Sequence, residues 1–314
     1  MKAVIAGGAG ALGSSVAKIL IDLDLYDIHI YDIIHKDRAW RLGPIIDDVI
    51  YHWKSVHDMD PTDFENTNLV VYASAQPDRP LGISSPAHTI YENCMGLTRV
   101  LEACKYANID KFLYPGSGTT FTGVPHDQLP VTESTIPMPT NPYSASKYMD
   151  EILCDTYRRC YKVPTVILRS GLVYGPGMRL GISVAQFIIK ALEGGVLNVT
   201  SPEATRTPTY LEDVLKYWKA VITLPPEMVV GNIFHSVYGK EYSILAIAEE
   251  VINVVGNGEV KISSRYEKGE SLRGKPVREW TTSTKDEYLG VKLEFDLAEG
   301  IQKTVQYIRE ALDI

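Results

Sequence analysis

The chain has 314 residues, of which 45% are hydrophobic and 22% charged, which is ordinary for a globular protein of one large or two modest domains. Its formal charge of −8, with no block of like charge, argues against a nucleic-acid backbone as the main partner. No apolar run approaches the roughly 18 residues of a membrane span, so we expect no membrane partner.

Short β-rich runs alternate with helical patterns through the first two thirds of the chain. The predicted strands are 2–6, 28–32, 69–75, 111–117 and 164–170, and the predicted helices are 11–23, 86–107 and 143–161. This alternation predicts an α/β fold with a Rossmann-type doubly wound parallel sheet. The last third is less regular, with helices predicted at 181–194, 210–223, 243–255 and 297–312.

The N-terminal segment "MKAVIAGGAGALG" is predicted to be a strand that enters a glycine loop, not a signal peptide. Gly7, Gly10 and Gly13 permit a tight turn and let backbone N–H groups of the following helix approach a pyrophosphate. The second strand ends in Asp32, 19 positions after Gly13. A carboxylate there accepts hydrogen bonds from ribose hydroxyls and repels a 2′-phosphate, which predicts NAD and disfavours NADP.

The four cysteines and seven histidines show no pattern of a metal or disulfide site. Cys94, Cys104, Cys154 and Cys160 lack CxxC spacing, and the sequence contains neither HxH nor HExxH. We therefore predict no metal, expect buried reduced thiols, and place the protein in the cytoplasm. Asp58, in "SVHDMD", either meets an adenine edge or is a solvated loop acid.

A tyrosine and a lysine stand four positions apart in "NPYSASKYMDEI". Positions i and i+4 share one helix face, so the ammonium of Lys147 favours the ionised form of Tyr143. The same spacing recurs at Tyr288 and Lys292, where Gly290 weakens any helix. Spacing alone therefore does not establish a catalytic pair.

Taken together, these motifs resemble the extended short-chain dehydrogenase/reductase superfamily. The resemblance rests on GxxGxxG at 7–13, Asp32, "VVYASAQ" at 70–76, Asn93, and the pair Tyr143 and Lys147. It continues through "LRSGLVYGPG" at 168–177, "TRTPTYLEDV" at 205–214 and "STKDEYLGVKLEFDLAEGI" at 283–301. Within the superfamily, the chain is most similar to sugar-nucleotide epimerases and dehydratases of the UDP-glucose 4-epimerase type.

The resemblance implies a role for each matching residue. Tyr143 would exchange a proton with a substrate hydroxyl, while Lys147 would lower the tyrosine pKa and hold the nicotinamide ribose. Ser117 is the first choice for the partner hydroxyl and Thr119 the second, and Asn93 would be a structural or proton-relay residue. The residues expected to bind NAD are Gly7, Gly10, Ala11, Leu12, Gly13, Asp32, Asp58, Met59, Ala73, Ser74, Ala75, Asn93, Tyr143 and Lys147.

The turn after the fifth strand indicates the type of reaction. Dehydratases of this group need acidic residues beside the hydroxyl partner, and the segment 116–123 contains none. The remaining options are an epimerase of a nucleotide-linked sugar and a dehydrogenase of a sugar or small alcohol. A non-catalytic NAD-sensing module is disfavoured, because such a module would be expected to lose Tyr143 or Lys147.

Two arginines are expected to bind the substrate together with Ser117. Arg206 and Arg273 match positions that meet a diphosphate in the related enzymes, although either could instead form a surface ion pair. Leu172 occupies a position that usually supplies an asparagine to the diphosphate, and "VTSPEATR" lacks the usual glycine-rich turn before Arg206. These departures leave open a different sugar nucleotide or a smaller alcohol.

The resemblance also predicts the domain organisation and the assembly. We expect a NAD-binding domain at 1–168 that also receives part of 207–235, and a smaller C-terminal α/β substrate domain at 169–314. Helices 86–107 and 143–161 would form a four-helix homodimer interface; the alternative is that their apolar side chains only cover the sheet. The side chains in question are Leu97, Leu101, Met149 and Leu153.

Overall fold

The computed structural model describes residues 1–263 and 277–312 and divides the chain into two compact units. The first unit contains 1–120, 139–169 and 218–234, and the second contains 121–138, 170–217 and the rest of the chain from 235. Helix α7 (Leu211–Thr223) and strand β11 (Ile233–Ser236) each contribute residues to both units.

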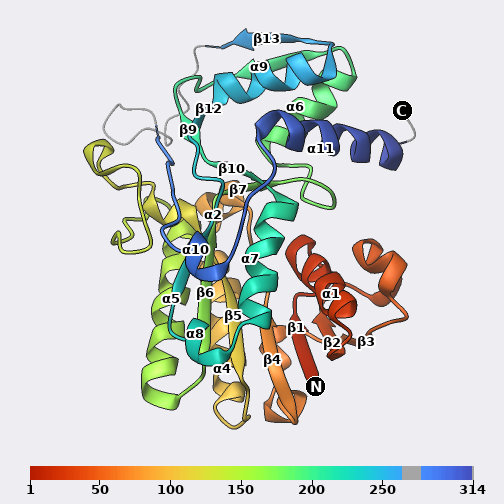
Figure 1. The fold of residues 1–314 in the computed structure, drawn as a ribbon, viewed down its shortest axis with the longest axis vertical. Helices are drawn as coiled ribbons and strands as arrows, with labels where there is room; N and C mark the ends of the chain where they lie inside the picture. The colour runs from red at the N-terminus through yellow and green to blue at the C-terminus, as the bar shows by residue number, and fades with distance from the viewer. Residues whose placement is uncertain (264–276, 313–314) are drawn as a thin grey trace. The chain divides into compact units, whose positions relative to one another are not determined.

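A seven-stranded sheet forms the centre of the first unit, in the order β11-β6-β5-β4-β1-β2-β3 (Figure 1). Strand β1 pairs in parallel with β2 and β4, β2 with β3, and β4 with β5. The strands are β1 (Lys2–Ala6), β2 (Asp27–Asp32), β3 (Ile50–Trp53), β4 (Thr67–Tyr72), β5 (Lys111–Ser117) and β6 (Thr165–Ser170), besides β11. The strand order reverses between β1 and β4, which is where ligands bind in such sheets.

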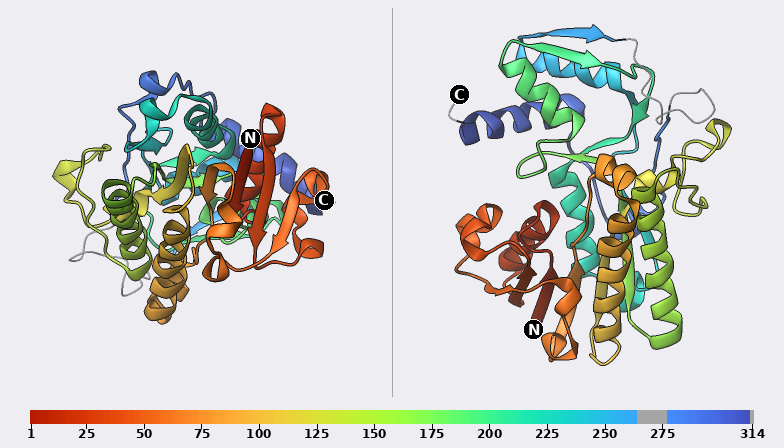
Figure 2. Two further views of the ribbon diagram at one scale, coloured as in Figure 1. Left: turned by 90° about the horizontal axis from the view of Figure 1, so that it is seen from below. Right: turned by 180° about the vertical axis from the view of Figure 1, so that it is seen from behind.

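Helices cover both faces of this sheet (Figures 1 and 2). Side chains that alternate along the strands, such as Val4, Val70 and Phe112, share one core with Leu97 and Leu101 of α4. Strand β3 and the short helices were not predicted, and β4 begins and ends earlier than the predicted 69–75. The helices are α1 (Ala11–Leu23), α2 (Arg79–Ser84), α3 (Pro86–Ile90), α4 (Gly96–Cys104), α5 (Pro142–Tyr161), α7 and α8 (Pro226–Val229).

The helix predicted at 86–107 is interrupted. Between α3 and α4, residues Tyr91–Met95 form one π-helical turn, and α4 ends at Cys104. A π turn adds a residue to the turn and redirects a side chain, and such turns are frequent at functional sites. Asn93 lies in this turn with its side chain 1% exposed. Hydrophobic periodicity does not reveal such an insertion.

The second unit contains short strands and four helices in its described part. Strand β7 (Leu172–Tyr174) pairs with β10 (Pro208–Tyr210), β8 (Val196–Val199) with β13 (Glu259–Ile262), and β9 (Thr205–Arg206) with β12 (Tyr242–Ser243). Its helices are α6 (Ser183–Leu192), α9 (Ile244–Val255), α10 (Asp286–Leu289) and α11 (Leu297–Leu312). Helix α10 stops at Gly290, which has a left-handed φ of +66°, so Tyr288 and Lys292 do not share a helix.

Residues 121–138 were expected in the first domain, but the structure places them in the second unit. Val131 donates its N–H to Trp280 O and accepts from Thr282 N. The Glu133 carboxylate accepts from the N–H groups of His235 and Thr284. These partners lie more than 100 positions away in the sequence, so local patterns could not indicate them.

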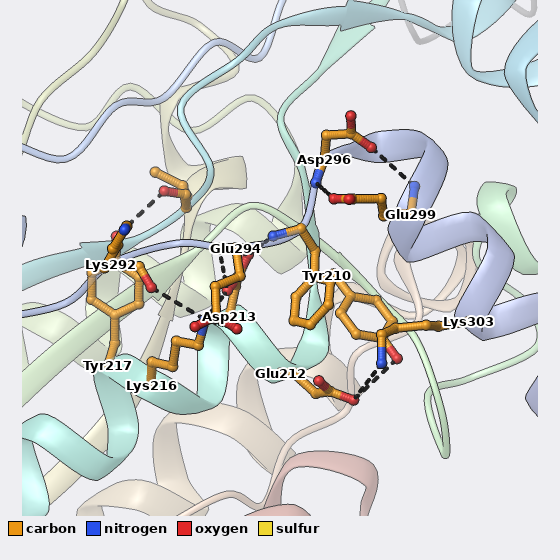
Figure 3. A network of polar contacts seen from close by, with 12 residues as sticks. Tyr210, Glu212, Asp213, Lys216, Tyr217, Lys292, Glu294, Asp296, Glu299 and Lys303 are labelled. Carbon is orange, nitrogen blue, oxygen red and sulfur yellow. Dashed lines mark hydrogen bonds and ion pairs between the residues drawn. The ribbon is translucent and has the colours of Figure 1, made fainter.

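A buried aspartate ties the start of α7 to the segment before α11 (Figure 3). Asp213 is fully buried and accepts hydrogen bonds from Lys216 Nζ at 2.7 Å and from the N–H groups of Glu294 and Phe295 at 3.0 Å. The Lys216 ammonium also bonds Lys292 O. A buried carboxylate with this many donors is compensated in charge and fixes the backbone of the donor segment.

The cysteines differ from the prediction at one position. Cys94, Cys104 and Cys154 are buried thiols, whereas Cys160 is exposed near the end of α5. Burial raises the pKa of all three buried thiols, which keeps them protonated and unreactive. None of the helices in 1–263 and 277–312 has the length and apolar character needed to cross a bilayer.

We predict that Asp213→Ala lowers the free energy of unfolding by roughly 2–4 kcal/mol, because a partly exposed ammonium and two backbone N–H groups lose their buried acceptor. Urea denaturation of the full chain measures this. The matched control is Glu212→Ala, since the neighbouring carboxylate is half exposed, lies 4.0 Å from Lys303 and accepts only a long hydrogen bond of 3.4 Å from Tyr210 Oη. It should cost less than about 1 kcal/mol. Equal losses in both variants would contradict the role assigned to Asp213.

Candidate active site

The glycine loop between β1 and α1 leaves no space for side chains at two positions. Gly7 has a φ of +86°, and a Cβ there would lie 2.5 Å from Ser74 N, so the loop after β4 sits directly against it. A Cβ on Gly13 would overlap Gly7 O. No side chain caps the N-terminus of α1 at Gly10, so N–H groups of its first turn can meet an anion.

Asp32 is held beside this loop at the end of β2. Its Oδ2 accepts from Ala9 N at 2.9 Å, and its Oδ1 accepts from Ile34 N at 2.9 Å. The residue is only 8% exposed. The predicted acid therefore occupies the same edge of the sheet as the glycine loop, as a dinucleotide with its ribose beside its pyrophosphate requires. The residues present fit this group.

The other expected cofactor residues differ in exposure. Ala73 N donates to Ala6 O, which fixes the loop after β4, while Ala75 is exposed. Asp58 is exposed, in keeping with either of its two interpretations. Met59 is fully buried in the core, so only its backbone can face a ligand.

Asn93 links three parts of the first unit. Its Oδ1 accepts from Gln76 N at 2.7 Å, and its Nδ2 donates to Gln76 O at 3.3 Å and to Ser146 Oγ at 2.8 Å. Ser146 Oγ in turn donates to Tyr143 O. The side-chain amide therefore holds the loop after β4 and the first turns of α5, and the structural and proton-relay roles both stay predictions.

Helix α5 presents the tyrosine and lysine from its first two turns. Asn141 caps it by accepting from Ser144 N at 2.9 Å, and Ser144 Oγ accepts from Asn141 N, which forms a capping box. Tyr143 is half-buried and packs closely against α2. The closeness shows at Gly82 of α2, where an added Cβ would lie 3.3 Å from Tyr143 Cβ. Lys147 is 3% exposed.

The end of β5 carries the two predicted hydroxyl groups. Ser117 Oγ and Thr119 Oγ1 lie 2.9 Å apart and share a hydrogen bond, and Thr119 N donates to Ser117 Oγ. Helix α5 leads from β5 to its sheet neighbour β6 and runs back along the sheet. Its N-terminus therefore lies at the edge where Ser117 ends β5. Tyr143 and Ser117 belong to the same edge.

Sequence analysis missed a buried polar cluster below this pair. Tyr114 donates from Oη to Asp150 Oδ2 at 2.7 Å, and the Lys147 ammonium lies 4.2 Å from the centre of the Tyr114 ring. Glu151 forms a bidentate ion pair with Arg169, in which both side chains are 3% exposed. Asp150 and Glu151 follow Lys147 by three and four positions, so the sequence already places them on the same helix face as the lysine. That spacing was the available signal of a charged cluster around Lys147.

The predicted substrate residues on the second unit give a mixed result. Arg206 is partly buried, donates to Thr205 O at 2.8 Å and lies 3.6 Å from Glu279 Oε1, so it takes part in an ion pair. Leu172 packs against the core of this unit and carries no polar group. Arg273 lies outside the described residues. No group of three or more His, Cys, Asp or Glu side chains that could hold a metal occurs in the described part of the chain.

Comparisons with known proteins identify the family of the chain. The profile of the NAD dependent epimerase/dehydratase family matches residues 3–235. A Methanocaldococcus jannaschii protein whose provisional name is UDP-glucose 4-epimerase is 28% identical over 98% of both chains. The mouse dTDP-D-glucose 4,6-dehydratase is 26% identical over 98% of this chain and 89% of its own. The Thermotoga maritima UDP-glucose 4-epimerase, solved with UDP-glucose, superposes with a TM-score of 0.86 at 23% identity over 99% of this chain and all of its own.

We predict that the protein binds NAD roughly 10²-fold or more tightly than NADP, because the fixed carboxylate of Asp32 would meet a 2′-phosphate at short range. Calorimetric titration with both dinucleotides measures the ratio. Asp32→Asn should reduce the preference by about tenfold or more. Asp37→Asn, which changes an exposed acid in the following loop, should leave it unchanged. Equal affinities of the unsubstituted protein would refute the role of Asp32.

Proposed function

Because the chain belongs to the NAD dependent epimerase/dehydratase family, whose members are enzymes that use NAD, we propose that it is an epimerase of a nucleotide-linked sugar. The observation that carries this proposal is the polar end of β5. Ser117 and Thr119 offer hydroxyls at the same edge as Tyr143, and the segment 116–123 has no carboxylate that could drive elimination of water. Epimerisation needs one proton acceptor and donor and one redox cofactor, and no further acid.

In this proposal Tyr143 accepts the proton of a substrate hydroxyl and later returns it. Lys147 stabilises the tyrosinate from one helical turn away. The hydroxyls of Ser117 and Thr119 hydrogen-bond the reacting oxygen and orient it toward Tyr143 Oη. We assign Ser117 the direct contact, because it also accepts from Thr119 N and is therefore fixed in position.

Bound NAD supplies the acceptor and donor of the hydride. The backbone of Gly7 to Gly13 would hold its pyrophosphate and Asp32 its adenosine ribose. Lys147 would bind the nicotinamide ribose. Asn93 supports this arrangement, since it fixes both the loop after β4 and the helix turn that bears Tyr143.

Arg206 is the candidate anchor for the nucleotide. We propose that Arg206 binds the diphosphate, since a guanidinium matches phosphate oxygens in a bidentate manner. Its present partner Glu279 is 8% exposed and holds the side chain in place. An epimerase needs such an anchor because the sugar has to present its other face while the nucleotide stays bound.

Two observations favour a second candidate, a NAD-dependent dehydrogenase of a sugar or small alcohol. Leu172 cannot hydrogen-bond a diphosphate, and the charge of Arg206 is already partly neutralised by Glu279. A dehydrogenase would use the same Tyr143, Lys147 and Ser117 but would release its oxidised product. The two candidates therefore differ in whether NADH accumulates.

We predict that, among UDP-, GDP- and dTDP-linked sugars, at least one is converted into a stereoisomer without net formation of NADH. Nuclear magnetic resonance identifies the isomer, and nicotinamide absorbance measures NADH. Tyr143→Phe should lower turnover by roughly 10²–10⁴-fold while NAD affinity is kept. Lys147→Ala should lower both the turnover and the affinity for NAD.

The control is Tyr288→Phe, which removes the hydroxyl of the other tyrosine spaced four positions from a lysine. Tyr288 is exposed on the short helix α10, so its loss should leave turnover unchanged. NADH formed in proportion to an oxidised product would support the dehydrogenase. Full activity of Tyr143→Phe would exclude both candidates.

We propose that the protein is a homodimer through α4 and α5. The sequence-based choice of Leu97 and Leu101 for this interface is wrong, because both are fully buried against the sheet, and Leu153 packs on the same core. Met95, Met149 and Ile152 are instead exposed on the turn before α4 and on α5. We propose that these exposed apolar side chains contribute to the interface.

We predict that Ile152→Glu converts the dimer into a monomer, because a charge would be buried at the interface. Sedimentation at micromolar concentration measures the mass. Leu25→Glu, which alters an exposed apolar residue after α1, should leave the dimer intact. A monomeric unsubstituted protein would refute the proposal.

We also propose a cytoplasmic location. The cysteines of the chain are free thiols, which suits a reducing compartment. NAD-linked chemistry fits the same compartment. Fractionation of cells that express the protein tests this.

A further inference from the structure

Helix α5 buries an ammonium and a carboxylate that contact opposite parts of one phenol. Lys147 and Asp150 are 3% and 1% exposed. The Lys147 ammonium lies 4.2 Å from the centre of the Tyr114 ring, and the Tyr114 hydroxyl donates to Asp150 Oδ2 at 2.7 Å. Tyr114 stands on β5 three positions before Ser117, and Lys147 stands four positions after Tyr143. The cluster therefore lies directly below the reacting groups.

Neither charge has a complete set of partners. Asp150 Oδ1 has no hydrogen-bond partner among the described residues, although the atom is inaccessible to solvent. Among the described residues, the Lys147 ammonium contacts the face of the Tyr114 ring and lies close enough to Asp150 for the two charges to attract each other. Buried charges persist only where another charge or several donors compensate them. Here the lysine and the aspartate compensate each other across the tyrosine.

The electronic structure of the phenol couples the two contacts. A hydroxyl that donates to a carboxylate gains negative charge, and part of that charge spreads into the ring. A ring of higher electron density attracts a cation on its face more strongly. The Asp150 carboxylate therefore strengthens the attraction between the Tyr114 ring and the Lys147 ammonium.

We propose that Asp150 is a positioning residue of the active site: its carboxylate, acting through the Tyr114 hydroxyl, holds Lys147 on the Tyr114 ring and offsets part of the lysine's charge at Tyr143. This inference rests on the proton-transfer role proposed for Tyr143. A tyrosine that only accepts a proton works best with a strongly lowered pKa. A tyrosine that accepts and then returns the proton needs a pKa near the working pH. The counter-charge of Asp150 would limit the attraction that Lys147 exerts on an ionised Tyr143.

Several groups act on the protonation of Asp150. Burial raises the pKa of the carboxyl above its usual range, whereas Lys147, the Tyr114 hydroxyl and the Cys94 thiol lower it. Arg169 neutralises Glu151, the other acid on this helix face. The titratable groups that face Asp150 are Tyr114 on β5, Tyr72 on β4, Cys94 in the π-helical turn, and Lys147, Glu151 and Cys154 on α5.

The raised pKa means that this carboxyl binds its proton more tightly in the folded than in the unfolded chain. Its contribution to stability therefore falls as the pH rises from the usual carboxyl range through the raised value.

The test uses Asp150→Asn in the full chain with NAD bound. Tyrosinate absorbance is titrated for this variant and for the same protein with Tyr143→Phe added, and the difference reports Tyr143 alone. Loss of the negative charge should lower the apparent pKa of Tyr143 by about one unit, a tenfold change in its ionisation. The acid limb of kcat/KM should move to lower pH by the same amount. The melting temperature should be unchanged or higher.

Two further variants separate this role from general effects of charge. Tyr114→Phe keeps the ring but removes the hydroxyl that lowers the pKa of the Asp150 carboxyl. The ionised form of Asp150 is then less favoured, and the titration of Tyr143 should move in the same direction as in Asp150→Asn. Asp155→Asn removes a charge from the solvent side of the same helix, where Asp155 pairs with Arg158 and Arg159. It should leave the titration of Tyr143 unchanged.

The outcomes distinguish the inference from the proposed function. The inference is overturned if correctly folded Asp150→Asn shows an unchanged or a higher apparent pKa of Tyr143. This holds even if the enzyme is an epimerase. A downward shift supports it, whatever product the activity assays identify. A fall in melting temperature with no change in the titration would show that Asp150 is purely structural and would also overturn the inference.

Discussion

Buried charge on α5 is the constraint on which the first unit depends. Three charged side chains of this helix, Lys147, Asp150 and Glu151, are removed from solvent, and each must be compensated by a group on the sheet. Tyr114 of β5 contacts the Lys147 ammonium with its ring and donates its hydroxyl to Asp150. Arg169 of β6 forms an ion pair with Glu151. These contacts fix both the rotation of α5 and its position along the sheet. They also place the helix N-terminus at the edge where β5 ends.

The edge itself is assembled by tight backbone packing. Gly7 lets the loop after β4 approach the glycine loop. Asp32, at the end of β2, holds the glycine loop in place by accepting a hydrogen bond from Ala9 N. Asn93 then joins the loop after β4 to α5. A ligand bound along this edge would meet backbone donors, a carboxylate and a tyrosine whose positions are fixed before it arrives, which lowers the entropic cost of binding.

The second unit uses the same principle with different partners. Asp213 and Glu133 are carboxylates that accept several backbone N–H groups, and each fastens a distant segment without regular secondary structure. Arg206 is likewise held by a carboxylate, because it forms an ion pair with Glu279. Charged groups in this unit thus hold loops in place, and a substrate with two phosphates would have to exploit or replace one of these pairs.

The sequence by itself determined the α/β alternation, the glycine loop with Asp32, and the helix that presents Tyr143 and Lys147, because each depends on backbone conformation or periodicity within a short segment. The tertiary structure alone decided which groups surround them. Tyr114 and Asp150 meet across 36 positions, and Asn93 reaches a residue 53 positions away. Such contacts depend on the packing of one element on another, which periodicity does not encode. The π turn and the placement of 121–138 escaped sequence analysis for the same physical reason, which also left open whether the apolar face of α4 covers the sheet or forms an interface.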